Sequence, residues 1–120
     1  MGRRVLLVED ESLVALLLED MLLELGFTVV DVASRLDAGM SAAELAAFDV
    51  AVLDVNLGGE SRSFPIADLL RQRGIPFVFA TGHDPGSLEQ TYPDAPVVRK
   101  PFLRGDLCAA LARALNCSPC

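Results

Sequence analysis

The stretch Val50-Ala51-Val52-Leu53-Asp54 decides the fold class, because four consecutive apolar residues end abruptly at a carboxylate. Short apolar runs of this kind are typical of strands that are buried on both faces of a parallel sheet. Three other apolar runs in the chain also end in polar or charged residues. These residues are Glu9 and Asp10, Thr81, and Lys100. Since the carboxyl ends of parallel strands meet at one edge of a sheet, the sequence predicts a polar site along that edge.

Strand and helix signals alternate along the whole chain. We expect strands over 4–8, 28–33, 48–53, 76–80 and 97–99. Helices are expected over 12–25, 35–46, from Pro65 to about Gly74, and 103–116, with a short, distorted or mobile helix between the turns at 84–86 and 92–96. Strict alternation predicts an α/β fold with a doubly wound, five-stranded parallel sheet, (βα)5. A chain of 120 residues has the length of one domain, so we take 1–120 as a single domain.

Several helix ends and buried faces can be predicted as well. Gly26 and Gly74 are placed to follow helices in the left-handed conformation. Ser34 is expected to cap the helix over 35–46, with Asp37 reaching back to the cap. Helical spacing assigns a core face in the first helix to Val14, Leu17, Leu18, Met21 and Leu25. The last helix carries leucines on one face at Leu103, Leu107, Leu111 and Leu115.

Composition excludes several classes of protein. Apolar residues make up 52% of the chain and charged residues 22%, which argues against disorder. The 17 acidic and 10 basic residues give a net charge of −7, so nucleic acid is not expected as a partner. No apolar run reaches the ~20 residues of a membrane span, and the N-terminus lacks the apolar core of a signal peptide. We therefore expect a cytoplasmic protein that does not bind membranes.

The cysteines do not form a recognisable metal site. Cys108 falls in the last predicted helix, and Cys117-Ser118-Pro119-Cys120 forms a CxxC pair at the end of the chain. A zinc site would need two more soft ligands, and His83 is the single histidine. We interpret residues 117–120 as a flexible tail, and a redox pair or half of a zinc site is the alternative.

The polar residues at the strand ends suit a divalent cation and a phosphoryl group. Glu9, Asp10 and Asp54 would repel one another unless a cation lies among them, and hard oxygen ligands favour Mg²⁺. With that cation in place, Asp54 stays ionised and can attack phosphorus in line. Lys100 can pair with phosphoryl oxygens, and Thr81 can donate its hydroxyl to another. Each residue alone would fit a turn, a helix end or a solvated surface, and their combination favours the phosphoryl site.

With these residues the chain resembles the response-regulator receiver domains of two-component signalling, over essentially its full length. The matching motifs are Val8-Glu9-Asp10-Glu11, Val52-Leu53-Asp54-Val55-Asn56-Leu57, Thr81 after Ala80, and Lys100-Pro101-Phe102. The resemblance implies a flavodoxin-like fold and a phosphoacceptor that takes a phosphoryl group from a histidine kinase or a histidine phosphotransferase. It implies no enzyme activity beyond the protein's own phosphorylation and dephosphorylation.

The resemblance also implies a role for each acidic residue of the site. Asp54 would be the phosphoacceptor, and Asp10 would bind the metal directly. Glu9 would act mostly through water, and Asn56 would bind the metal through its backbone carbonyl. These four residues are therefore the expected Mg²⁺ site.

Other roles concern the phosphoryl group. Thr81 and Lys100 would bind it, with a cis peptide between Lys100 and Pro101. Asn56 and His83 occupy positions that, in this family, tune how fast water removes the phosphoryl group. For His83 the alternative is a solvent-facing loop residue.

One departure from the family pattern concerns the switch mechanism. Most receiver domains carry an aromatic residue three positions before the lysine, and here that position is Val97. The run Pro76-Phe77-Val78-Phe79-Ala80-Thr81-Gly82 is similar to the signature of a receiver subgroup that lacks the aromatic switch and is often stand-alone. We therefore expect the segment 83–96 to change conformation on phosphorylation instead.

Docking and the wider role leave alternatives open. Leu16 and Leu23 lie opposite the predicted core face, so they are either ordinary surface residues or part of a docking patch for a kinase. A stand-alone regulator would signal to an unknown downstream protein or serve as a phosphate sink. The alternatives are a scaffold that works without phosphorylation and a segment of a larger hybrid kinase. A phosphatase is least favoured, since Asn56 stands where such enzymes often carry a second acid.

Overall fold

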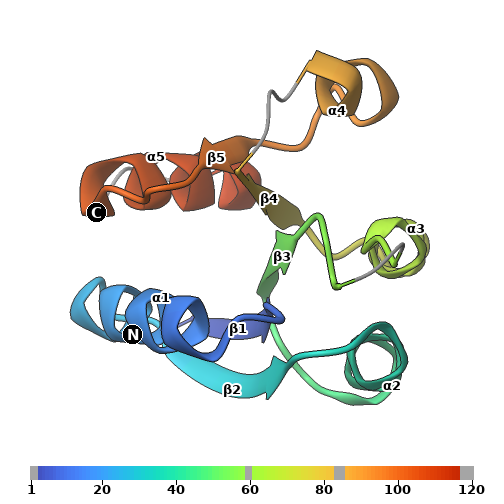
Figure 1. Cartoon of the computed structure of the whole chain (residues 1–120), viewed down its shortest axis with the longest axis horizontal. Helices are drawn as coiled ribbons and strands as arrows, with labels where there is room; N and C mark the ends of the chain where they lie inside the picture. The colour runs from blue at the N-terminus through green and yellow to red at the C-terminus, as the bar shows by residue number, and fades with distance from the viewer. Residues whose placement is uncertain (1–2, 59–60, 83–85, 117–120) are drawn as a thin grey trace.

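The computed structural model describes residues 3–58, 61–82 and 86–116. Within these ranges five strands and five helices alternate, as the sequence predicts. They are β1 (Arg4–Val8), α1 (Ser12–Glu24), β2 (Thr28–Ala33), α2 (Leu36–Leu45), β3 (Val50–Asp54), α3 (Phe64–Arg73), β4 (Phe77–Thr81), α4 (Gly86–Thr91), β5 (Val97–Arg99) and α5 (Arg104–Leu115). The strands form one parallel sheet in the order β2-β1-β3-β4-β5 (Figure 1). The predicted doubly wound α/β fold is confirmed.

Helices cover both faces of the sheet (Figure 1). α1 and α5 lie on one face, and α2, α3 and α4 lie on the other. Because successive side chains of a strand point to opposite faces, the central strands supply two apolar cores. In β1, Val5 and Leu7 pack with α1 and α5, whereas Leu6 and Val8 pack with the helices of the other face. All of β3 and β4 is buried, which explains why those strands are continuous apolar runs.

The helix ends confirm the two predicted glycines and contradict the predicted serine cap. Gly26 and Gly74 follow α1 and α3 with φ of 91° and 72°, as predicted. Ser34, however, does not cap α2. The backbone stays extended through Arg35, so the helix begins at Leu36 and the Ser34 hydroxyl lies one residue too early. Asp37 instead accepts a hydrogen bond from the amide of Ala38.

The buried face of α1 is rotated from the predicted one. Ala15, Leu18 and Leu22 are the residues that this helix buries. Leu17 lies on the side of α1 away from that face and is 48% exposed, so its assignment to the core was wrong. The other predicted residues flank the buried face and are half-buried: Val14, Met21 and Leu25.

The last helix requires a similar correction. Leu107 and Leu111 are fully buried against the sheet, as predicted. Leu103 is 65% exposed, because it precedes α5 in an extended conformation and does not share the helix's face.

Among the described residues, no helix combines the length and the apolar character needed to cross a membrane.

The fourth helix is short, as expected, and aromatic rings anchor its end. α4 has six residues and is followed by Tyr92, which is 4% exposed. The Tyr92 ring stacks on Phe64 of α3 at 5.7 Å and meets Phe77 and Phe79 of β4 edge-on. Its hydroxyl donates a hydrogen bond of 2.9 Å to Asp68 of α3. Tyr92 therefore ties the segment after α4 to α3 and to the sheet.

Replacing Tyr92 should separate the contribution of its ring from that of its hydroxyl. We expect Tyr92→Ala to lower the free energy of unfolding by ~3 kcal/mol, because a buried ring and its aromatic contacts are lost. Tyr92→Phe should cost about 1 kcal/mol or less, since Asp68 is exposed and water can replace the lost donor. Urea unfolding measures both values. Equal losses in the two variants would contradict the assignment of the stabilisation to the ring.

Candidate functional site

The carboxyl ends of four strands bring the predicted polar residues to one edge of the sheet. Glu9 and Asp10 follow β1, Asp54 is the last residue of β3, and Thr81 is the last residue of β4. Lys100 follows β5, and its amide donates a hydrogen bond of 2.8 Å to the carbonyl of Thr81. The cis peptide expected between Lys100 and Pro101 is present.

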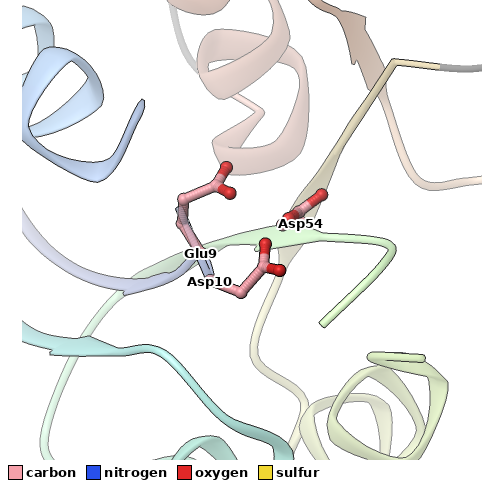
Figure 2. Close-up of side chains that lie close together, drawn as sticks. All are labelled: Glu9, Asp10 and Asp54. Atoms are coloured by element: carbon pink, nitrogen blue, oxygen red, sulfur yellow. The ribbon is translucent and has the colours of Figure 1, made fainter. Parts of the chain in front are cut away.

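Three carboxylates share a small space at this edge. One carboxylate oxygen from each of Glu9, Asp10 and Asp54 lies within 4.8 Å of the others, and Figure 2 shows the three side chains turned toward one another. Glu9 is 1% exposed and Asp54 4% exposed. Burial of like charges at this spacing is unfavourable without a cation to offset them.

The same cluster fits a small divalent cation. The buried Oε1 atom of Glu9 makes no hydrogen bond within the described part of the chain, although the Lys100 ammonium lies 3.2 Å from it as an ion pair. Ligands of an octahedral Mg²⁺ at about 2.1 Å lie at most about 4.2 Å apart, so small side-chain movements, or a water in place of Glu9, would complete such a site. The donors are all oxygen atoms, which Mg²⁺ prefers.

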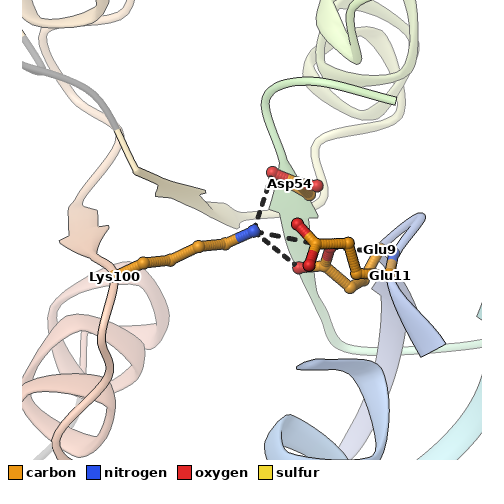
Figure 3. A network of polar contacts seen from close by, with 4 residues as sticks. All are labelled: Glu9, Glu11, Asp54 and Lys100. Carbon is orange, nitrogen blue, oxygen red and sulfur yellow. Dashed lines mark hydrogen bonds and ion pairs between the residues drawn. The ribbon is translucent and has the colours of Figure 1, made fainter. Parts of the chain in front are cut away.

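Lys100 reaches into the cluster from the opposite side (Figure 3). Its Nζ atom lies 3.2 Å from Oε1 of Glu9 and 3.5 Å from Oδ1 of Asp54. Burial lowers the pKa of Lys100, but the charges of Asp54 and Glu9 outweigh burial and raise it above its ordinary value. Lys100 is therefore a fixed positive charge beside the carboxylate of Asp54.

Asp54 has a strongly perturbed acidity. The pKa of Asp54 is raised from 3.8 to about 8, mainly by burial and also by hydrogen bonding with Glu9 and Asp10. The charge of Glu9 also contributes to this rise in pKa, whereas the charge of Lys100 opposes it. A cation among the carboxylates would favour the ionised form, which is the nucleophilic one.

A cavity of about 410 Å³ opens onto the site and shows a residue that the sequence analysis missed. Asp54, Asn56 and Lys100 line it, and so does Arg62 from the loop between β3 and α3. Arg62 follows no apolar run and belongs to no recognisable motif. The one sequence signal for Arg62 was that it is a basic residue within ten positions after Asp54, the candidate phosphoacceptor.

Other predicted residues lie away from the site or outside the described residues. Leu16 and Leu23 of α1 are 58% and 54% exposed, which is compatible with either of their two interpretations. His83 and the CxxC pair at Cys117 and Cys120 lie outside the described residues. Val97 is half-buried in β5, at the position where most receiver domains carry an aromatic residue.

Comparison with known proteins identifies the family. Residues 5–112 match the response regulator receiver domain. The chain belongs to this family. This receiver domain is 31% identical over 118 residues to the phyllosphere-induced regulator PhyR of Methylorubrum extorquens. That match covers 96% of the receiver domain but 44% of PhyR, so the chain spans less than half of that relative.

Solved structures support the same assignment. The solution structure of SdrG from Sphingomonas melonis is 41% identical to this receiver domain and superposes with a TM-score of 0.84, covering 95% of this chain and 97% of SdrG. The BeF3-activated conformation of SdrG is 42% identical, with a TM-score of 0.79 and coverage of 93% and 95%. The receiver fold predicted from the sequence is therefore shown.

The raised pKa of Asp54 should appear in the pH dependence of stability. Without metal, the native protein holds a proton on Asp54 between about pH 4 and pH 8, and the unfolded chain does not. The free energy of unfolding should therefore fall as pH rises through this window. Asp54→Asn should remove this contribution and be more stable than the wild type at pH 8 by more than about 1 kcal/mol.

Urea unfolding at pH 4, 6 and 8 with a chelator measures this difference. The advantage of Asp54→Asn should grow with pH, and saturating Mg²⁺ should reduce it at pH 8, because a bound cation stabilises the ionised wild-type cluster. A constant difference between variant and wild type across these pH values would contradict the pKa assignment.

Proposed function

We propose that this receiver domain is a phosphoacceptor that takes a phosphoryl group from a phosphohistidine onto Asp54 in the presence of Mg²⁺. The observation that carries this proposal is the place of Asp54. Its buried carboxylate lies among Glu9 and Asp10 on one side and 3.5 Å from the Lys100 ammonium on the other, at the floor of an open cavity. A phosphoryl group entering that cavity meets the nucleophile and positive charge together.

The chemistry is an in-line displacement. An oxygen of Asp54 forms a bond to phosphorus while the bond from phosphorus to the donor's imidazole nitrogen breaks, and that nitrogen takes up a proton. Lys100 exchanges its contact with Asp54 for contacts with phosphoryl oxygens. Thr81, at the end of the neighbouring strand, donates its hydroxyl to another of these oxygens. Hydrolysis of the acyl phosphate then returns the domain to its resting state.

The metal would be held by Glu9, Asp10 and Asp54, with the backbone carbonyl of Asn56. Bound there, Mg²⁺ would offset the charge of the carboxylates and of the incoming phosphoryl oxygens. One solved structure of SdrG is of its BeF3-activated conformation, and this supports a phosphoryl-binding role for the related site here. In this proposal the domain acts on no separate substrate and is not an enzyme in that sense.

The kinase or phosphotransferase would dock on α1. Leu16 and Leu23 are exposed on this helix, and Leu13 is 82% exposed beside Leu16, in the turn of α1 next to Asp10. Leu16 lines a cavity together with Glu9 and Asp10, so this exposed apolar face begins beside the site. Such a face suits contact with a helix that presents a phosphohistidine. A cytoplasmic location would fit such a partner.

The output would pass through the segment that contains α4. Val97 stands in place of an aromatic switch. The aromatic contacts of this segment join its own Tyr92 to Phe64, Phe77 and Phe79. A hydrogen bond from the Thr81 hydroxyl to a phosphoryl oxygen would change the conformation at the end of β4, and this segment follows β4 in the chain. The downstream partner would read the changed surface of 86–96 by direct contact.

Intact-mass spectrometry tests the phosphoacceptor directly. Incubation of the wild type with acetyl phosphate and Mg²⁺ should add one phosphoryl group, and Asp54→Ala should add none. A chelator should abolish the addition in the wild type, because the crowded carboxylates then disfavour an ionised nucleophile. Thr81→Ala and Lys100→Ala should both lower the yield.

The absence of any adduct on folded wild-type protein, together with no response to trifluoroberyllate and Mg²⁺, would contradict the proposal. That outcome would favour a scaffold that works without phosphorylation.

Charge placed on α1 should separate kinase docking from the chemistry of the site. Leu16→Asp with Leu23→Asp should slow transfer from a cognate kinase by at least about tenfold, because two apolar contacts are replaced by charges. Phosphorylation by acetyl phosphate should stay within about twofold of wild type, since neither leucine lies in the cavity.

Leu45→Asp is the matched control. Leu45 is 83% exposed at the end of α2 on the opposite face of the sheet. This control should leave both rates unchanged. Equal loss of the two reactions in the α1 variant would show damage to the site rather than to docking.

A further inference from the structure

Arg62 is fixed beside the cavity by its backbone. It lies in the loop between β3 and α3, where Asn56 and Arg62 form an antiparallel bridge. The next residue, Ser63, is fully buried, and its amide donates a hydrogen bond of 3.0 Å to the carbonyl of Val55. Because Val55 directly follows Asp54, the loop holds the main chain of Arg62 close to the phosphorylation site. Its side chain is exposed and can reorient within this frame.

The charge of the Arg62 guanidinium is not paired with a carboxylate in the described part of the structure. Within the described part of the chain it donates one hydrogen bond of 3.2 Å, to the carbonyl of the adjacent Ser61, and it forms no ion pair with a carboxylate. Lys100, in contrast, is held between Glu9 and Asp54. Of these two basic residues in the cavity wall, Arg62 is the one available to a ligand.

The cavity that Arg62 lines is surrounded by acidic residues. Asp10, Glu11 and Asp54 line the cavity, and the buried Glu9 lies directly beside them. A phosphoryl donor carries about two negative charges near neutral pH and is repelled by an acidic cavity. A divalent cation and Lys100 together offset three of these four negative charges, so a further positive charge is needed to make the cavity neutral.

We propose that Arg62 is a phosphoryl-binding residue whose guanidinium turns from Ser61 into the cavity and binds the phosphoryl oxygens that face solvent. The planar guanidinium presents two parallel N–H donors, which match two oxygens of one phosphoryl group. This inference rests on the proposed role of Asp54 as phosphoacceptor. Because the contact is available both to the donor and to the group in transfer, it strengthens binding more than it accelerates the chemical step.

The test compares Arg62→Ala and Arg62→Lys with the wild type. Initial rates of phosphorylation, measured by intact mass at increasing acetyl phosphate with saturating Mg²⁺, should show an apparent KM about fivefold higher in Arg62→Ala. The maximal rate should change by less than about twofold. Arg62→Lys should recover part of the KM effect. The concentration of trifluoroberyllate needed for half-saturation, followed by NMR of backbone amides, should rise by a similar factor in Arg62→Ala.

Arg3→Ala controls for the change in net charge. Arg3 is exposed and precedes β1, at the opposite edge of the sheet from the cavity. This control should match the wild type in both measurements. Equal KM values for Arg62→Ala and wild type would overturn the role of Arg62, and so would equal weakening by Arg3→Ala. If the wild type itself takes up no phosphoryl group and no trifluoroberyllate, the proposed function fails instead.

Discussion

Repulsion among three carboxylates is the constraint on which the rest of this receiver domain depends. Glu9, Asp10 and Asp54 place oxygen atoms within 4.8 Å of one another at the edge of an apolar sheet. Burial and this crowding raise the pKa of Asp54 to about 8, so the resting site is costly to ionise without a cation. In the proposed function, the same crowding that makes the metal-free site unfavourable would favour binding of Mg²⁺ and, through the metal, of a phosphoryl group.

The parallel sheet makes such a cluster possible. β3 and β4 are buried throughout, and β1 is buried after Arg4. At the carboxyl end of each strand a polar side chain reaches the same edge: Glu9 after β1, Asp54 in β3 and Thr81 in β4. Lys100 is brought to that edge by β5, and its amide is bonded to the carbonyl of Thr81. The charged residues of the candidate site are thus fixed by strands with apolar cores on either side. Rigid placement of this kind lowers the reorganisation needed when charge moves.

The parts expected to respond to phosphorylation are built differently. α4 is six residues long, and the loop that carries Arg62 holds its backbone by a few hydrogen bonds to the end of β3. Tyr92 anchors the segment after α4 by ring packing and by one hydrogen bond to an exposed carboxylate, Asp68. The hydrogen bonds of these elements lie near the surface and can be exchanged with water at lower cost than those of the sheet, whereas the Tyr92 ring stays packed. The domain therefore combines a rigid candidate site with less firmly held elements at its rim.

The sequence by itself determined the alternation of strands and helices, because apolar runs and helix-ending glycines such as Gly26 and Gly74 act locally. It also placed Asp54, Thr81 and Lys100 at one edge, since parallel strands align their carboxyl ends. Tertiary structure alone decided which side of α1 is buried, leaving Leu17 exposed, and which ring packs beside β4. Tertiary structure also decided that Arg62 lines the cavity beside Asp54. These outcomes depend on contacts between residues distant in the chain, which local spacing does not encode.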